Sequence, residues 1–216
     1  MLMTPHPLEP FVTAARLARM RQVLAQRLAW FTVVLDNLFD PHNISAVLRS
    51  CDAFGVQNVH VIESVETFKV NREISMRADK WLTLHRWRSF AECRTALKRR
   101  RFTLLATSVA ADALPLDAAP CDRRVAVVLG NEHRGVSEAT RAACDGVVTI
   151  PMHGFVESLN VSVAAALVIA GCAGRMRRAG RQVLLSPRER SAVWNTWMRQ
   201  QVKHPDQVLA RLQAGG

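Results

Sequence analysis

The sequence has few of the features that mark secreted, zinc-binding or membrane proteins. Its 5 cysteines are scattered without a C-x-x-C pair, which argues against a disulfide framework and a zinc site, so no metal is expected. The N-terminus lacks the charged and then apolar pattern of a secretory signal, and no apolar run reaches the length of a transmembrane helix. We therefore expect a cytoplasmic protein with reduced thiols and no membrane partner.

Three common motifs of α/β enzymes are missing as well. No G-x-G-x-x-G follows an apolar strand, which argues against a dinucleotide site. Gly130 and Gly135 have the spacing of a phosphate loop, but Val136 and Ser137 stand where that loop needs Lys and then Ser or Thr. There is no G-x-S-x-G, so a hydrolase with a nucleophile elbow gains no support either. Any ligand must be bound by a different device.

Acidic residues are scarce, with 18 Asp and Glu against 29 Lys and Arg and a net charge of +11. Most of the excess lies at the two ends, because residues 1–30 and 171–216 are rich in arginine whereas residues 31–170 are close to neutral. A basic end can serve solubility alone. Basic segments beside a neutral body nevertheless favour a polyanionic partner, and the preference for Arg over Lys indicates phosphate recognition.

Short apolar strands alternate with helices, which predicts an α/β fold with a parallel sheet and helices on both faces. The predicted strands are residues 31–36, 58–63, 82–87, 102–108, 125–130 and 147–150. The predicted helices are residues 9–28, 41–54, 72–80, 89–100, 137–144, 158–178, 187–201 and 205–213. We expect a basic N-terminal helix in residues 1–30, a central domain in 31–174 and a basic helical extension in 175–216.

Three polar or glycine-containing segments follow predicted strands, at the place where open α/β sheets bind ligands. They are residues 35–55, 127–140 and 150–171. The first and second have ordinary structural explanations. Asn43 can be a simple first-turn residue and Arg49 can pair with Asp52 at i+3. The carboxylate of Glu132, between the two glycines of the second segment, can be solvated.

The third segment is harder to explain by structure alone. Ser158 can serve as the N-cap of the apolar helix that follows it, so its polarity needs no function. Asn160 lies inside the expected first turn of that helix, where a cap does not account for it.

Together the three segments resemble the three motifs of the SpoU-type RNA ribose 2′-O-methyltransferases, in the SPOUT class. The motifs read Asn43-x5-Arg49, Leu129-Gly-Asn-Glu132-x2-Gly135 and Ile150-Pro-Met-x-Gly154-x3-Ser158-Leu-Asn160-Val-Ser-Val-Ala-Ala-Ala. The resemblance covers about residues 30–175, and the third motif is long and specific.

This resemblance implies that S-adenosyl-L-methionine is the cofactor and a ribose 2′-hydroxyl the methyl acceptor. It also implies a C-terminal trefoil knot and a homodimer. By position, the cofactor pocket would be lined by Thr107, Leu129, Gly130, Ile150, Met152 and Leu159. The catalytic residues would be Arg49, Asn43, Glu132, Ser158 and Asn160.

The family's catalytic arginine corresponds to Arg49, which is thought to help deprotonate the hydroxyl. An Arg side chain has a pKa above about 12 and is a poor base near neutral pH. Either its site lowers that pKa, or Arg49 contacts the substrate phosphate and stabilises the developing alkoxide.

The two basic ends of the chain indicate which class of RNA is the substrate. Only about 30 residues precede the first strand, and the short basic helices on both sides resemble the tRNA (guanosine-18-2′-O)-methyltransferase (TrmH-like) branch of the family. The resemblance therefore implies methylation of tRNA at guanosine 18 of the D-loop. Candidate phosphate contacts are Arg16, Arg19, Arg175, Arg177, Arg178 and Arg181. Two alternatives stay open, an rRNA ribose 2′-O-methyltransferase and a non-catalytic basic RNA-binding protein.

Overall fold

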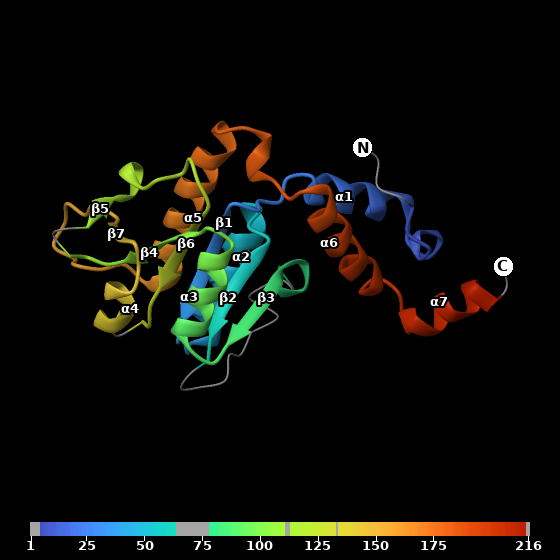
Figure 1. Cartoon of the computed structure of the whole chain (residues 1–216), viewed down its shortest axis with the longest axis horizontal. Coiled ribbons are helices and arrows are strands. Elements are labelled where there is room, and N and C mark those ends of the chain that lie inside the picture. Colours follow the sequence, from blue (N-terminus) through green and yellow to red (C-terminus); the bar gives the residue numbers. More distant parts are fainter. Residues whose placement is uncertain (1–4, 64–77, 111–112, 133, 215–216) are drawn as a thin grey trace. The chain divides into compact units, whose positions relative to one another are not determined.

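The computed structural model describes the chain except for residues 1–4, 64–77, 111–112, 133 and 215–216. The chain divides into two units, one formed by Met1–Arg27 with Leu184–Gly216 and the other by Leu28–Val183 (Figure 1). None of the described helices is long and apolar enough to span a bilayer.

The larger unit contains a parallel sheet, as predicted. Its strands are β1 (Phe31–Asp36), β2 (Asn58–Ile62), β3 (Thr83–Trp87), β4 (Thr103–Thr107), β5 (Leu114–Pro115), β6 (Val125–Leu129) and β7 (Gly146–Thr149). They lie in the order β3-β2-β1-β6-β4-β7-β5, and every neighbouring pair is parallel. The sequence did not predict β5, because two exposed residues that include a proline carry no strand pattern.

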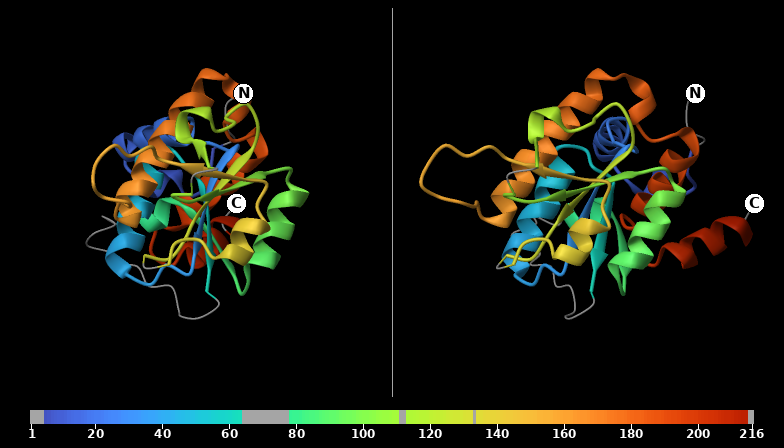
Figure 2. Two further views of the ribbon diagram at one scale, coloured as in Figure 1. Left: turned by 90° about the vertical axis from the view of Figure 1, so that its left-hand side faces the viewer. Right: turned by 60° about the vertical axis from the view of Figure 1, so that its left-hand side comes forward.

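Helices cover both faces of this sheet, which confirms the predicted α/β class. Figure 2 shows one pair of helices on one face, α2 (Pro41–Ala53) and α5 (Val161–Arg178). The other face carries α3 (Phe90–Arg99) and the short α4 (Glu138–Ala142). All six residues of β1 are buried, as expected for a strand covered on both sides.

Alternate side chains of the strands supply the core beneath α3. Val34, Leu104 and Val128 are completely buried and pack with Cys93 and Leu97 of that helix. Burial of such side chains contributes about 1.5–3 kcal/mol each. This packing holds β1, β4 and β6 against α3 and so supports the ends of β4 and β6.

The start of α2 follows the predicted signals. Asp40 is the N-cap and its carboxylate accepts a hydrogen bond from the backbone N–H of His42 at 2.9 Å, while Pro41 occupies the first turn. The predicted helix over residues 72–80 lies largely outside the described residues, and Ala78–Trp81 forms a 3-10 helix.

The described residues of the smaller unit form the α-helices α1 (Ala14–Leu24), α6 (Pro187–Arg199) and α7 (Pro205–Ala214). The predicted helix over residues 9–28 is shorter than expected, because Thr13 caps α1 and Glu9–Phe11 forms a separate 3-10 helix. Trp197 is buried in this unit, with the guanidinium of Arg27 5.4 Å from its ring centre.

The division between the units falls later in the chain than the change in charge suggests. α5 continues to Arg178, and the carbonyl of Val183 accepts a hydrogen bond from the N–H of Ala29 at 2.8 Å. Residues 175–183 therefore belong to the larger unit, whereas the charge pattern groups them with the basic extension.

Candidate active site

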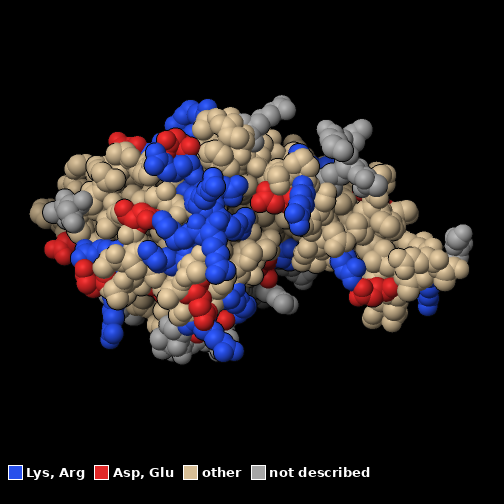
Figure 3. All heavy atoms as spheres, in the orientation of Figure 1, with Lys and Arg blue, Asp and Glu red and all other residues tan. Residues whose placement is uncertain are grey.

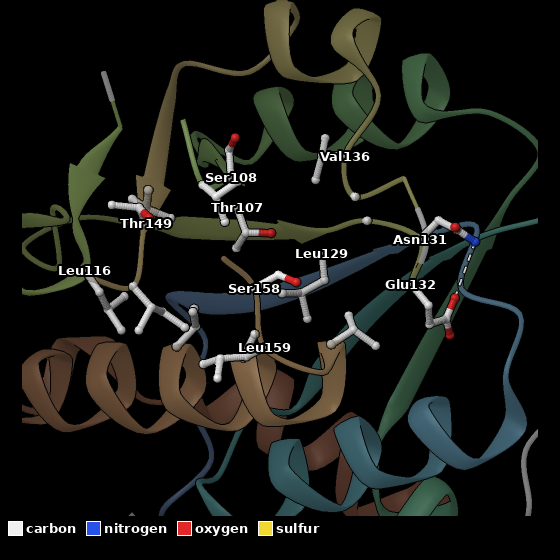
Figure 4. Close-up of a pocket in the computed structure, with 18 of the residues that line it drawn as sticks. Thr107, Ser108, Leu116, Leu129, Asn131, Glu132, Val136, Thr149, Ser158 and Leu159 are labelled. Atoms are coloured by element: carbon white, nitrogen blue, oxygen red, sulfur yellow. Dashed lines mark hydrogen bonds between the residues drawn. The ribbon is translucent and has the colours of Figure 1, made fainter. Parts of the chain in front are cut away.

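A pocket of about 360 Å³ lies at the carboxyl ends of β4, β6 and β7 (Figure 4). These strand ends contribute Thr107, Leu129 and Thr149, and α5 closes the opposite wall with its first turns. Figure 4 shows Leu129 and Leu159 near Ser158 and Leu116 on the side of Thr149, with Thr107 between them. The pocket therefore offers apolar walls with a few polar groups, which is typical of a site for a small organic molecule.

The loop after β6 owes its shape to two glycines. A Cβ placed on Gly130 would lie 2.0 Å from the backbone carbon of Gly135, so only glycine fits there. Gly135 has a positive φ of 63°, which favours glycine as well. The N–H of Asn131 donates to the carbonyl of Gly135 at 3.1 Å, and the reverse bond measures 2.8 Å. The backbone thus turns back on itself at the pocket wall.

Beside the pocket, one hydrogen-bond chain joins the three segments that the sequence singled out. The amide Nδ2 of Asn160 donates to Oδ1 of Asn43 at 3.1 Å. Nδ2 of Asn43 donates in turn to the Glu132 carboxylate at 3.4 Å. Asn43 is 9% exposed, so both of its polar atoms are satisfied by residues that are distant in sequence.

The carboxylate of Glu132 has further donors. The backbone N–H of Asp40 donates to Oε1 at 3.3 Å, and Nδ2 of Asn131 donates to Oε2 at 3.3 Å (Figure 4). Asn131 Nδ2 also donates to the carbonyl of Asn37 at 3.2 Å. This carboxylate is therefore fixed between the loop after β1 and the loop after β6.

The interpretation of Asn160 and Ser158 from the sequence is wrong in one respect. α5 begins at Val161, so the N-cap is Asn160 and not Ser158. Oδ1 of Asn160 accepts from the N–H of Ser162 at 2.8 Å, while its Nδ2 is bonded to Asn43. One side chain thus caps the helix and links two motifs. Ser158 lines the pocket instead.

Arg49 stands apart from the other four predicted catalytic residues. It lies on α2 and is exposed, and no described residue is hydrogen-bonded to it. Six positions separate Arg49 from Asn43, and this spacing places the two on different faces of a helix. The structure therefore brings Asn43, Glu132 and Asn160 together and places Ser158 in the adjacent pocket, but it shows no contact with Arg49.

All the residues predicted to line a cofactor pocket lie in this one pocket. Sequence reasoning missed several others, namely Ser108, Leu116, Asn131, Val136, Thr149, Val161, Ala164 and Val168. Ser108 directly follows β4 and Thr149 ends β7, and a position at the end of a strand is a signal that the sequence also offers. Ala164 and Val168 belong to an apolar helix whose pattern does not distinguish a pocket wall from core.

The end of β1 carries a buried acid beside the same loops. Thr140 donates its hydroxyl to Asp36 Oδ2 at 3.0 Å, and Nδ2 of Asn37 donates to Oδ1 at 2.9 Å. Burial raises the pKa of the Asp36 carboxyl, and the two hydrogen bonds oppose that rise. Asp36 therefore ties the end of β1 to α4. Within the described ranges, no group of three or more His, Cys, Asp and Glu side chains is arranged to bind a metal ion.

The predicted phosphate-binding arginines are divided between the two units. Arg16 and Arg19 are exposed on α1 and bond to Gln201 and Gln22. In the larger unit, Arg178 is exposed at the end of α5. Arg177 donates to the carbonyl of Phe54 at 3.0 Å, and Arg175 donates to the carbonyl of Asp117. The side chain of Arg181 lies outside the described residues.

Comparison with known proteins assigns the fold and the motifs to one family. The model of the SpoU rRNA Methylase family matches residues 30–170. The tRNA (guanosine(18)-2'-O)-methyltransferase of Thermus thermophilus is 39% identical over 168 residues, which are 78% of this chain and 87% of that protein.

Two solved structures are similar in three dimensions. The A. aeolicus TrmH/SpoU tRNA modifying enzyme has a TM-score of 0.80 at 29% identity, and the match covers 91% of this chain and 98% of that one. The SpoU methyltransferase AviRb from Streptomyces viridochromogenes, in complex with the cofactor AdoMet, has a TM-score of 0.61 at 27% identity. That match covers 74% of this chain and 65% of AviRb.

Proposed function

The chain belongs to the SpoU rRNA methylase family, and on that basis we propose that it methylates a ribose 2′-hydroxyl in tRNA with S-adenosyl-L-methionine as cofactor. The proposed target is guanosine 18 of the D-loop. One observation carries the proposal: a small-molecule pocket lies directly beside the hydrogen-bond chain of Glu132, Asn43 and Asn160.

The pocket fits the proposed cofactor in size and chemistry. Its volume of about 360 Å³ lies in the range of small-molecule sites. Leu129, Ile150 and Leu159 offer apolar walls to a flat ring, and Gly130 contributes backbone to the lining of the pocket. When bound, S-adenosylmethionine supplies a methyl group that its sulfonium charge makes electrophilic. We assign the walls to Thr107, Leu129, Gly130, Ile150, Met152 and Leu159.

The chain's own polar residues position the RNA. Asn43, held by Glu132 and Asn160, keeps a fixed orientation at the start of α2, and Ser158 faces the pocket. Positioning of this kind contributes much of the rate when the reacting groups need only be aligned. Arg49 is exposed, and a guanidinium offers several N–H donors in a geometry that suits a phosphate. We therefore assign Arg49 to the substrate phosphate and to the alkoxide that develops, rather than to proton removal.

We also propose the trefoil knot that is characteristic of the family. Two observations support it. β7 lies between β4 and β5, and the chain then passes through residues 150–160 to reach α5, which packs against α2 and β1. A chain that crosses from one edge of a sheet to its centre can pass through a loop formed earlier.

A homodimer is the proposed assembly. Phe155 is fully exposed, Val156 is 63% exposed, and Val163 and Leu167 on α5 are 49% and 45% exposed. A second copy would cover these apolar side chains, which otherwise remain in water. A Val163→Arg/Leu167→Arg variant should sediment as a monomer at concentrations where the parent is a dimer. A dimer that persists in this variant would place the contact elsewhere.

The direct test is methyl transfer from radiolabelled S-adenosylmethionine to tRNA transcripts. The parent should label tRNA at one ribose, mapped to position 18, and Arg49→Ala should lose at least 100-fold in rate. An rRNA fragment as substrate tests the alternative that the family description names. Labelling of rRNA in preference to tRNA would overturn the choice of substrate. Absence of transfer to either RNA would favour a binding protein.

Two further assignments rest on the same proposal. We propose that residues 31–174 carry the catalysis and that the basic helices in residues 1–30 and 175–216 bind RNA. The cytoplasm is the proposed location, because tRNA is the proposed substrate.

A further inference from the structure

Basic side chains gather at the edge of the sheet opposite to the pocket. Lys98, Arg99, Arg100 and Arg101 end α3 and lead into β4, and Arg123 and Arg124 precede β6. We call these six residues the basic edge. Figure 3 shows Lys and Arg side chains gathered over α3 and the strand starts next to it. The net charge of residues 31–170 did not reveal this cluster, because acidic and basic residues nearly balance over that range.

The basic edge keeps an excess of positive charge after its recorded ion pairs. Lys98 pairs with Asp145 at 2.7 Å and Arg123 with Asp122 at 2.9 Å. Arg99 and Arg101 are exposed. The remaining two, Arg100 and Arg124, each place a guanidinium 5.8 Å from the ring centre of the buried Phe102. The ring holds these two side chains from the core side.

Arg101 occupies a position that would suit glycine better. Its φ is 62°, and the N–H of Arg101 donates to the carbonyl of Lys98 at 2.9 Å. The N–H of Phe102 donates to the carbonyl of Leu97 at 3.1 Å. These two bonds form the Schellman motif that ends a helix, in which the left-handed residue is usually Gly. The turn does not need a side chain here, so the charge of Arg101 calls for another explanation.

The helix dipole explains only part of the cluster. Cations are stabilised in the last turn of a helix, which accounts for Lys98 and Arg99. Arg101 lies beyond the helix end, and Arg123 and Arg124 come from a different segment of the chain. Basic side chains that two separate segments bring to one surface are better explained by an anionic partner that contacts both segments.

We propose that the basic edge binds RNA phosphates at a distance from the reacting ribose. This inference rests on the proposed function for its choice of RNA. The pocket lies at the ends of β4 and β6 and the basic edge at their starts, so roughly 15 Å of strand separates them. An RNA that contacts both must reach at least this far from the reacting ribose. We place this second contact on the folded body of the substrate, in addition to the contacts proposed for the terminal helices.

The neighbouring surface favours RNA over an acidic protein or a membrane. Arg99 lines a shallow groove together with Trp87, Thr95 and the small side chains of Ala91 and Ala96. Glu92 also borders this groove. A groove lined by both an aromatic ring and a guanidinium can stack an unpaired base and bind its phosphate. Five of the six basic residues are Arg, the side chain that binds phosphate bidentately.

The test compares two charge-matched variants by fluorescence anisotropy with full-length tRNA. Arg99→Gln/Arg101→Gln removes the exposed charges of the basic edge. The control, Arg86→Gln/Arg141→Gln, removes two charges that are already paired with Glu63 and Glu138. The first variant should bind tRNA about 10-fold more weakly, and its slope of log affinity against log salt should fall by roughly 1.5. The control should change affinity less than 2-fold.

A short hairpin that contains only the target loop locates the contact. Both variants should bind it as the parent does. Unchanged affinity of the first variant for full tRNA would overturn the proposal, as would an equal loss in the control. A loss of the same size with the hairpin would also overturn it, because the contact would then lie beside the reacting ribose.

Arg101→Gly distinguishes the effect of the Arg101 charge on tRNA binding from its effect on stability. This variant should unfold at a higher temperature than the parent and still bind tRNA more weakly. Higher stability with parental tRNA affinity would count against the proposal. Anisotropy measures tRNA binding and does not depend on catalysis. A failure of methyl transfer would therefore contradict the proposed function without affecting the test of the basic edge.

Discussion

The two edges of the same parallel sheet are built on opposite principles. At the carboxyl ends of the strands, Glu132, Asn43 and Asn160 satisfy one another's hydrogen bonds around a pocket. At the amino ends, guanidinium groups such as those of Arg99 and Arg101 point to solvent. Fixed geometry at one edge suits a reaction, and exposed charge at the other suits a mobile polyanion. A single sheet can thus separate chemistry from substrate capture.

Burial disfavours the charged form of titratable groups both at the pocket edge and on the α3 face of the sheet. At the pocket edge it raises the pKa of Asp36. On the α3 face, burial, His85 and Arg100 lower the pKa of His60 to about 3. Burial and Arg100 also lower the pKa of His85. Arg100 belongs to the basic edge, so the stacked pair of His60 and His85 senses the positive field there.

The largest expected effect is a loss of ligand affinity when the loop that lines the pocket is distorted. Gly130→Ala puts a methyl group against the backbone of Gly135, which must move. We expect a loss of at least 100-fold in affinity for S-adenosylhomocysteine by calorimetry, and a destabilisation of about 1–3 kcal/mol. Gly174→Ala is the control, because its Cβ meets open space in α5. It should stabilise the protein by about 0.5–1 kcal/mol. Full ligand affinity in Gly130→Ala would show that the loop is not the binding wall.

The next effect separates chemistry from cofactor binding at the same edge. Asn43→Ala removes the middle of the hydrogen-bond chain, so kcat should fall about 100-fold while the Kd for S-adenosylhomocysteine changes less than 3-fold. His42→Ala, on the exposed face of the same helix turn, should retain kcat within 3-fold. A variant that loses ligand affinity and keeps kcat would reverse the roles given to the two parts of the site.

A smaller effect concerns the α3 face and pH. The neutral form of His60 is favoured in the folded protein, whereas the unfolded chain binds a proton below its ordinary pKa near 6.5. Stability should therefore fall with acidification between pH 6.5 and about 3, by about 2 kcal/mol from pH 7 to pH 5. Urea unfolding of His60→Phe should show a flatter dependence, and the exposed His153→Gln should retain the parental slope. Equal slopes in all three proteins would contradict the assignment.

The smallest expected effect concerns the terminal helices. Arg16→Gln/Arg19→Gln should weaken tRNA binding about 3-fold at low salt, because exposed single contacts contribute little. The matched control is Arg21→Gln/Arg199→Gln, in which both arginines are paired with acids. The charge pattern suggests testing tRNA binding by deletion of the basic residues 176–216, but this deletion would also disturb the fold. The cut would remove the buried Met176 from α5 together with the buried Trp194 and Trp197.

The sequence predicts the sheet strands well because apolar runs such as Phe31–Asp36 leave little choice of structure. It predicts the pocket residues through the family motifs and not through periodicity. It fails at Asn160, because Ser and Asn are equally favourable N-cap residues and the local pattern does not decide whether α5 begins after Ser158 or after Asn160. It also misses the basic edge, because a neutral average over a long segment does not reveal which charges the fold brings together.

The strand order also dictates when the site can exist during synthesis. β1 pairs with β2 on one side and with β6 on the other, and the second partner is made much later than the first. A chain leaving the ribosome can form β1, β2 and β3 early, but one side of β1 stays unpaired until Val125–Leu129 emerges. Such an edge is open to wrong partners, and long-range parallel pairing is slow. This side of β1 therefore stays unpaired until Val125–Leu129 has been made, and α5 completes the pocket only after that.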